Sequence, residues 1–109
     1  LEAADALAGE GVFAEVIDLA TVKPIDFDTV LASVKKTGRC LVVSEAPRTC
    51  GLASEVSAVV SEQGLLSLLA PVERVTGWDC VTPLARLEAR YLPDAARVAA
   101  AARRLLAYQ

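Results

Sequence analysis

The feature that most constrains the fold is an uninterrupted apolar run, CLVV at residues 40–43, which lies between two segments with helical spacing of their apolar residues. Those segments are FDTVLASVKK at residues 27–36 and the stretch from residue 52 to about residue 68. An apolar run of this kind is typical of a strand that is covered on both faces. Successive strands joined through helices need crossover connections, which produce a parallel sheet. The pattern therefore predicts an α/β protein with three layers, in which helices cover both faces of a mostly parallel sheet.

The start of the chain continues this alternation. Apolar residues at helical spacing predict a first helix, which ends at Gly9 or Gly11. Residues 12–24 (VFAEVIDLATVKP) are then expected to contain a mostly buried strand. The inward side chains expected for these two elements are Leu1, Ala4, Leu7 and Ala8 of the helix and Phe13, Val16, Ile17 and Leu19 of the strand.

The next elements have clear start and stop signals. Asp26 is expected to cap the helix that follows, and Gly38 to end it after Lys35 and Lys36. Gly64 should weaken the second half of a later helix or end it early. The remaining expected elements are a strand over 39–46, a loop over 47–51, that helix over 52–68, a strand over 71–77, an irregular segment over 78–93 and a last helix that starts at Pro93 and Asp94.

This element order has one unusual property. Three strands make a thin sheet for four helices to cover. An α/β unit that begins on an amphipathic helix normally has a strand that leads into it, and none is present before residue 1. We therefore expect the chain to be a fragment whose first strand is missing.

Charge and hydropathy exclude two classes of function. The net charge is −3 and no run of like charges occurs, whereas a nucleic-acid surface needs clustered Lys and Arg. The only basic cluster, Arg103 and Arg104 with Arg97, lies near the end of the expected last helix, where cations suit the helix dipole. No apolar run approaches the ~20 residues of a membrane span. We expect neither a nucleic-acid partner nor a membrane partner.

The apolar fraction has two interpretations that the sequence leaves open. Apolar residues make up 54% of the chain, above the roughly 45–50% typical of soluble domains. Either one face is kept for a partner subunit, or the chain is simply rich in alanine because its genome is rich in G and C.

Cysteine and histidine usage argues against a metal site. Cys40, Cys50 and Cys80 form no CxxC pair and the chain has no histidine, so a zinc site or another site with histidine ligands is not expected. The three thiols are expected to be reduced and buried, as in a cytosolic protein.

The junction VVSEAPRTCGLASEV at residues 42–56 is where an α/β protein most often handles phosphates or nucleophiles. Its single glycine, Gly51, is too few for a P-loop or a dinucleotide fingerprint. Ser44 lacks the glycines of a nucleophile elbow and any histidine to act as its base. Cys50 lies near Arg48 and a helix start, which lower a thiol pKa, but it too lacks a base. We therefore expect no catalytic residue here.

The charges of this junction fit a contact surface better than a reaction. Glu45 and Glu55 could form an acid–base pair, although one sequence does not show whether they approach each other. The commoner arrangement is that Arg48 pairs with a nearby carboxylate and, with Pro47, makes the loop rigid. We interpret the loop as a rigid corner that presents charge to another protein.

Trp78 is the other candidate contact residue. It follows Gly77 at the end of a strand, where a large ring either anchors a partner or covers the end of the core. The sequence leaves these two interpretations open. Tyr91 is a second aromatic residue from the same region.

Several motifs in order carry a family resemblance. They are EVIDL with KPID, VKKTGR, EAPRT-x-G with a following Ser-Glu, APVERVTG-x-D and YLPD. Together they resemble the C-terminal, transketolase-type domain of the beta subunit of thiamine-diphosphate-dependent 2-oxoacid dehydrogenases, the decarboxylating component of the pyruvate and branched-chain complexes. Members of that family have a strand before the first helix, which agrees with the missing strand above. Residues 1–109 are accordingly expected to be a single C-terminal domain, truncated at its N-terminus.

The resemblance implies a division of labour. In such enzymes thiamine diphosphate and Mg²⁺ lie between the alpha subunit and the beta subunit's N-terminal domain, so this domain is expected to bind no cofactor or metal. It implies a contact with a second beta subunit in an α2β2 assembly, and a docking platform for the subunit-binding domain of the acyltransferase core. The interface and docking candidates are Glu45, Arg48, Gly51, Glu55, Arg74, Trp78, Asp79 and Tyr91.

The resemblance also implies the parent reaction, the oxidative decarboxylation of pyruvate or a branched-chain 2-oxo acid with transfer of the acyl group to a lipoyl arm. The isolated fragment is expected to be inactive. Ser44 stands where many relatives have histidine, and residues 80–83 (CVTP) differ from the aromatic loops of branched-chain members. The chain therefore does not distinguish the two substrates. The expected location is the cytoplasm of a bacterium, or the mitochondrial matrix of a eukaryote.

The alternative is a free-standing, flavodoxin-like α/β binding or regulatory module without catalysis. Such a module should be a stable monomer without a further strand. A fragment should instead show low stability, strand borrowing or self-association, because an unpaired strand position invites another chain.

Overall fold

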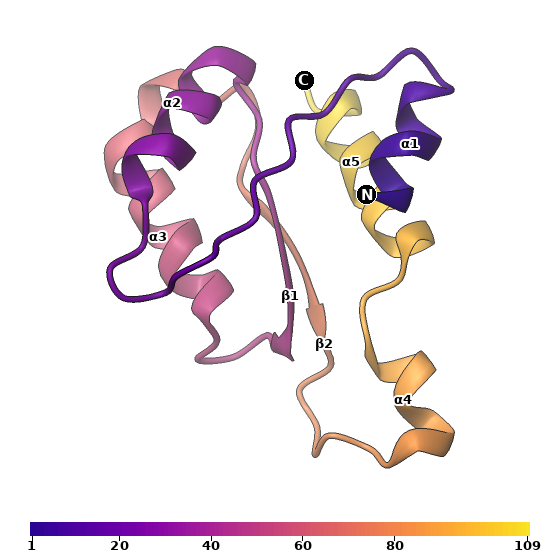
Figure 1. Cartoon of the computed structure of the whole chain (residues 1–109). Coiled ribbons are helices and arrows are strands. Elements are labelled where there is room, and N and C mark those ends of the chain that lie inside the picture. The colour runs from indigo at the N-terminus through magenta and orange to yellow at the C-terminus, as the bar shows by residue number, and fades with distance from the viewer.

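Two parallel strands form the centre of the structure, a computed structural model that describes all residues from 1 to 109 (Figure 1). Strand β1 (Leu41–Pro47) pairs in parallel with β2 (Glu73–Gly77), and the expected α/β class is confirmed. The helices are α1 (Glu2–Ala8), α2 (Phe27–Thr37), α3 (Leu52–Gly64), a short 3₁₀ helix η1 (Leu65–Ser67), α4 (Ala85–Tyr91) and α5 (Ala95–Ala107). None of them has the length and apolar character that a membrane crossing requires.

The helices form a layer on each side of the two strands. In Figure 1, α2 and α3 lie on one side, while α1 and α5 lie on the other. Helix α3 packs on both strands from its side, and α5 packs on both strands from the opposite side. The three-layer expectation is thus correct. Helix α4 extends beyond the carboxyl ends of the strands and contacts little else (Figure 1). The radius of gyration, 14.1 Å, therefore exceeds the about 13 Å expected for a compact chain of this length.

Each face has its own apolar cluster. Between α2, α3 and the sheet, Val30, Val34, Val56 and Val60 make one core cluster, in which Val60 is fully buried. Between α1 and α5 the buried residues are smaller, and the cluster is Ala3, Leu7 and Ala99. The expected inward face of the first helix is partly wrong, since Leu1 and Ala8 are exposed and Ala3 is buried instead. This shift follows from the packing of α1 on α5 rather than on a strand.

The predicted helix signals are largely confirmed. The Asp26 side chain accepts a hydrogen bond from the Thr29 N–H at the start of α2, and Gly38 ends that helix in the left-handed conformation. Asp94 caps α5 in the same way, through the Arg97 N–H at 2.7 Å. Helix α3 ends at Gly64, as its glycine indicated, and continues only as the 3₁₀ turn.

One predicted strand is wrong. Residues 12–24 form neither helix nor strand, and none of the backbone–backbone hydrogen bonds involves residues 13–24. Phe13 and Val16, expected to be buried, are 85% and 58% exposed. The physical reason is that an extended segment becomes a strand only when a neighbour pairs with its backbone, and no strand pairs with this segment here. The sheet therefore has two strands, where three were expected.

Residues 78–93 were expected to be irregular, yet they contain α4. Helix α4 is only 7 residues long, and no side chain caps its first turn. The start signal that identified α2 and α5 in the sequence is therefore absent.

Candidate interaction surface

The loop after β1 and the end of β2 are tied together into one corner. The Thr49 N–H and hydroxyl both donate to the Asp79 carboxylate, at 2.8 and 2.6 Å. The Arg74 guanidinium donates to the Ser54 hydroxyl at 2.6 Å and to the Arg48 carbonyl at 3.3 Å. These bonds join the loop, α3 and β2. The loop is therefore held by side-chain hydrogen bonds, and we call residues 45–55 together with residues 74–77 and Asp79 the corner.

Arg48 contributes to the corner in an unexpected way. It was expected to pair with a carboxylate, but its guanidinium donates to the Arg74 carbonyl at 3.1 Å and forms no ion pair. The acceptor of the loop is instead Asp79. Its pKa is lowered chiefly by the hydrogen bond from the Thr49 side chain, with smaller contributions from backbone N–H groups and from the charge of Arg48.

Two glycines of the corner are required by space. A Cβ at Gly51 would lie 2.6 Å from the Pro47 carbonyl oxygen, and one at Gly77 would lie 2.5 Å from that of Glu45. Contacts this short would force the backbone to move. Gly51, the single glycine of the EAPRTCG motif, is the N-cap residue of α3. A glycine is needed there because the loop backbone passes close to the start of that helix.

The corner leaves several charges free. Between Ser44 and Pro47 the register of the strand pair is irregular, because two residues of β1 have no partner in β2. One of these is Glu45, which is exposed, as is Glu55 in the first turn of α3. No hydrogen bond or ion pair within the chain involves the carboxylate of Glu45 or Glu55.

The cysteines differ from expectation. Cys50 and Cys80 are exposed, and only Cys40 is partly buried, where burial raises the pKa of its thiol. Cys50 has a positive φ of 58°, because the loop turns sharply just before α3. The expectation of three buried thiols is therefore wrong for two of them, which lie in loops at the exposed end of the sheet. No group of three or more Cys, Asp or Glu side chains could hold a metal ion.

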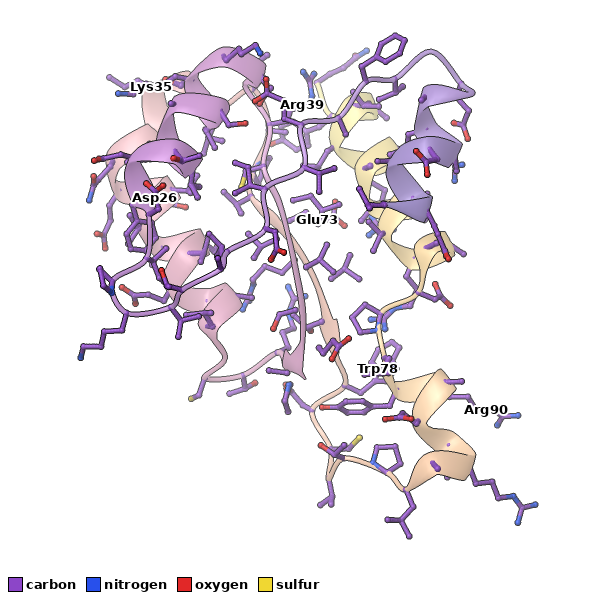
Figure 2. All side chains as sticks on the ribbon, viewed as in Figure 1. Asp26, Lys35, Arg39, Glu73, Trp78 and Arg90 are labelled. Carbon is purple, nitrogen blue, oxygen red and sulfur yellow. The ribbon has the colours of Figure 1, made fainter.

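Trp78 lies just beyond the corner and connects it to α4 and α5. Trp78 is 56% exposed, and the Arg97 guanidinium lies over its ring at 4.5 Å from the ring centre. The indole N–H donates to the Arg90 carbonyl at 3.0 Å, while the Arg90 side chain points outward from α4 (Figure 2). Of the two interpretations that the sequence left open, the structure favours an exposed ring over one that covers the core.

Tyr91 does not lie on the surface with the other candidates. It is only 4% exposed and packs where a side chain at Gly77 would have to be. Its hydroxyl and one nitrogen of Arg97 are buried without a hydrogen-bond partner. The sequence did not identify Thr49 or Arg97 as part of this region. Thr49 bonds to Asp79, 30 residues away, and Arg97 bonds to the Thr76 carbonyl, 21 residues away, and no local sequence pattern indicates either partner.

An apolar stripe continues from Trp78 along the segment that leads into α4. Its exposed members are Trp78, Val81, Leu84 and Leu87. Four exposed large apolar residues within residues 78–87 favour a contact surface along this segment.

Comparison with known proteins identifies the family of this chain. Residues 1–98 match the family described as "Transketolase, C-terminal domain". The chain belongs to this family. It is 46% identical over 108 residues to "Pyruvate dehydrogenase E1 component subunit beta" of Bacillus subtilis, which covers 99% of the chain and 33% of the relative. The expected resemblance is confirmed.

Two further relatives have different names. "2-oxoisovalerate dehydrogenase subunit beta" of Pseudomonas aeruginosa is 50% identical over 104 residues, 94% of the chain and 29% of the relative. "Acetoin:2,6-dichlorophenolindophenol oxidoreductase subunit beta" of Cupriavidus necator is 47% identical over 107 residues, 97% of the chain and 32% of the relative. The chain thus spans about a third of the length of the relatives that it matches.

Proposed function

We propose that this transketolase C-terminal domain is the assembly and docking domain of the beta subunit of a thiamine-diphosphate-dependent 2-oxoacid dehydrogenase. The parent enzyme would oxidatively decarboxylate pyruvate or a branched-chain 2-oxo acid and pass the acyl group to a lipoyl arm. The proposal is supported by identities of 46% and 50% to beta subunits over nearly the whole chain. It places the enzyme in the cytoplasm if the source is a bacterium.

The corner is the observation that carries the docking role. It combines a backbone held by side-chain hydrogen bonds with the exposed charges of Glu45, Arg48 and Glu55. A surface that is already rigid loses little conformational freedom on binding, and fixed charges select and orient a partner. Residues Gly51, Arg74 and Asp79 would act indirectly, by holding the corner in shape.

The apolar stripe supports the assembly role. Trp78 is its largest ring, and aromatic side chains are enriched at interface hot spots. We assign the stripe to the contact with a second beta subunit, and the corner to the subunit-binding domain of the acyltransferase core. Tyr91 is buried, so its contribution to either contact would be to hold Gly77 and Trp78 in place.

The residues of this chain do not fit thiamine diphosphate and Mg²⁺. A magnesium diphosphate needs several oxygen ligands close together, and the chain offers no cluster of three acidic side chains. A cavity of about 810 Å³ is lined by 23 residues, of which 16 are hydrophobic. Under the proposal the cofactor is therefore held by other parts of the enzyme, with the alpha subunit.

The experiment that tests this function uses the intact beta subunit with its alpha partner. Arg48→Glu should weaken tetramer formation or binding of the subunit-binding domain by about tenfold or more, because it reverses a charge at the contact. Thiamine diphosphate affinity of assembled tetramers should stay within about twofold. Sedimentation velocity, calorimetric titration of the subunit-binding domain and a separate cofactor titration measure the three quantities.

Lys35→Glu is the matched control, since Lys35 is exposed on α2 and its side chain makes no hydrogen bond or ion pair. It makes the same change in charge outside both the corner and the apolar stripe. Assembly and docking of Arg48→Glu that equal those of Lys35→Glu would contradict the proposal.

A further inference from the structure

Trp78 is held in place by residues of two helices. Its indole N–H donates to the Arg90 carbonyl in the last turn of α4, at 3.0 Å. The Arg97 guanidinium, which comes from the first turn of α5, lies 4.5 Å from the centre of the ring. Trp78 is nevertheless exposed. The ring is therefore a fixed feature of the surface, because groups from both helices restrict its rotation.

Arg97 is itself fixed at both ends of its side chain. Its backbone N–H donates to the Asp94 carboxylate at 2.7 Å, which sets the position of the first turn of α5. At the other end, Nη2 of its guanidinium donates to the Thr76 carbonyl in β2, at 2.8 Å. The side chain thus connects the start of α5 to the end of β2, and Trp78 lies two residues beyond the carbonyl that it reaches.

No carboxylate pairs with the guanidinium of Arg97. The residue is half-buried and forms no ion pair, and its Nη1 is buried without a hydrogen-bond partner. A partly buried cation without a counter-charge costs free energy, which other groups must offset. The groups that contact it are the Thr76 carbonyl and the face of the Trp78 ring. Attraction between a cation and an indole ring is stronger where both are removed from water, so this contact stabilises the position of the ring.

The cation over one face of the ring determines what suits the other face. A second cation there is disfavoured, because the two like charges would repel each other across the ring. An apolar or aromatic side chain carries no such penalty. The other exposed members of the apolar stripe, Val81, Leu84 and Leu87, favour the same kind of partner surface.

We propose that Arg97 is a positioning residue, which holds Trp78 as a preformed anchor whose open face takes an apolar or aromatic side chain of a second beta subunit. This inference rests on the assembly role proposed above for the apolar stripe. A ring that is fixed before contact loses less conformational freedom on binding, which strengthens association. Arg97 contributes to assembly only through Trp78 and contacts no partner itself.

A double-mutant cycle in the intact beta subunit, mixed with its alpha partner, tests this dependence. Sedimentation velocity over a dilution series measures the association of two αβ units into α2β2. Trp78→Ala should weaken association about thirtyfold or more, and Arg97→Gln about tenfold. Added to Trp78→Ala, Arg97→Gln should weaken it by less than a further factor of about two, because the ring on which it acts is gone. A further loss as large as that in the unchanged background would overturn the proposal.

Arg103→Gln is the matched control in the same helix. The Arg103 side chain pairs with Glu10 and makes no contact with Trp78. Its association should stay within about twofold of that of the unchanged subunit. A loss equal to that of Arg97→Gln would show that a general weakening of α5 is the cause, which contradicts a specific role for Arg97.

Fluorine NMR of the intact beta subunit labelled with 5-fluorotryptophan gives a readout that does not depend on assembly. The Trp78 resonance is assigned by its loss in Trp78→Phe. It should shift and broaden in Arg97→Gln, because the ring loses the cation that fixes it, and stay unchanged in Arg103→Gln. A resonance that is the same in Arg97→Gln and the unchanged subunit would overturn the proposal.

Ionic strength tests the chemistry of the partner side chain. The effect of Trp78→Ala on association should be the same at about 0.05 M and about 0.5 M salt, because an apolar contact is not screened. An effect that shrinks at the higher salt concentration would indicate a charged group on the ring and contradict an apolar or aromatic occupant.

Failure of the assembly role gives a different result from failure of this inference. If Trp78→Ala assembles as well as the unchanged subunit, the assembly role of the stripe is wrong and the anchor is wrong with it. If Trp78→Ala weakens association and Arg97→Gln does not, only the inference about Arg97 fails. Should Arg97→Gln not fold, Arg97→Lys replaces it, because an ammonium group lacks the planar fork that both stacks and donates. Its expected loss is about threefold, again absent in the Trp78→Ala background.

Discussion

On the α2 and α3 side of the sheet four valines form the core beside a cavity of about 350 Å³, whereas on the α1 and α5 side smaller residues border a cavity of about 810 Å³. The helices differ in composition, since α1 and α5 are richer in alanine than α2 and α3, and they also differ in how they pack. Helix α3 packs on both strands and on α2, while α1 contacts mainly α5. A helix that lies on a strand buries its apolar residues against that strand, and one without a strand beneath it buries only what its neighbouring helix covers. The packing of a helix thus shows whether a strand supports it.

A matched pair of valines tests this difference with the largest expected effect. Val60→Ala should lower the free energy of unfolding of the domain by about 2–3 kcal/mol, since a fully buried side chain is lost and a cavity remains. Val12→Ala should cost less than about 1 kcal/mol, because Val12 is only partly buried and borders an existing cavity. Urea unfolding of the protein that carries the domain measures both. Equal losses would show that the two sides are packed alike.

A helix cap compared with the unpaired segment at residues 13–24 should show a smaller difference in stability. Asp94→Ala should cost about 1 kcal/mol, because the N–H of Arg97 loses its acceptor at the start of α5. Asp18→Ala, in the segment without backbone hydrogen bonds, should change stability by less than about 0.5 kcal/mol. Thermal unfolding of the two variants under one condition is sufficient. A cost for Asp18→Ala as large as that of Asp94→Ala would mean that residues 13–24 are held more firmly than the structure shows.

The smallest effect is expected at the corner, as a dependence on pH. The folded state lowers the pKa of Asp79, chiefly through Thr49, so the ionised carboxylate contributes stability above its unfolded pKa of about 4. This contribution is lost as the pH falls through the lower, folded pKa. Asp79→Asn should therefore unfold at a lower temperature than the unchanged protein at pH 7, and the gap between the two should shrink below about pH 4.

Asp18→Asn is the control for that titration, because no hydrogen bond involves the Asp18 side chain. The unfolding temperature of Asp18→Asn should stay close to that of the unchanged protein at every pH. If the unfolding temperature of Asp79→Asn is below that of the unchanged protein by the same amount at pH 7 and pH 3, the charge of Asp79 is not what stabilises the corner.

The elements that could be predicted from the sequence are those with local signals. Asp26 and Gly38 bound α2 because a cap and a left-handed residue act within one turn, and the apolar run at 40–43 identifies β1. Residues 12–24 could not be assigned in the same way. Their apolar residues indicate the capacity to form a strand, but pairing depends on a neighbour that the local sequence does not contain.

The candidate surface was predictable to a similar extent. The motif at residues 45–51 located the rigid loop, and Gly51 and Pro47 are where its backbone closes. The bonds that hold it could not be predicted, because Thr49 and Asp79 are 30 residues apart and meet only through the register of β1 with β2. Likewise the burial of Tyr91 follows from the turn of α4 back toward Gly77, which no local pattern indicates.

The central claim is that this domain holds subunits together, and native mass spectrometry of the parent complex tests it most directly. The beta subunit with Trp78→Asp and Leu84→Asp, both in the exposed stripe, is mixed with its alpha partner and compared with the unchanged subunit. The account predicts that the unchanged pair forms α2β2 and that the variant stops at αβ, with thiamine diphosphate still bound. A variant that assembles as fully as the unchanged subunit would contradict it.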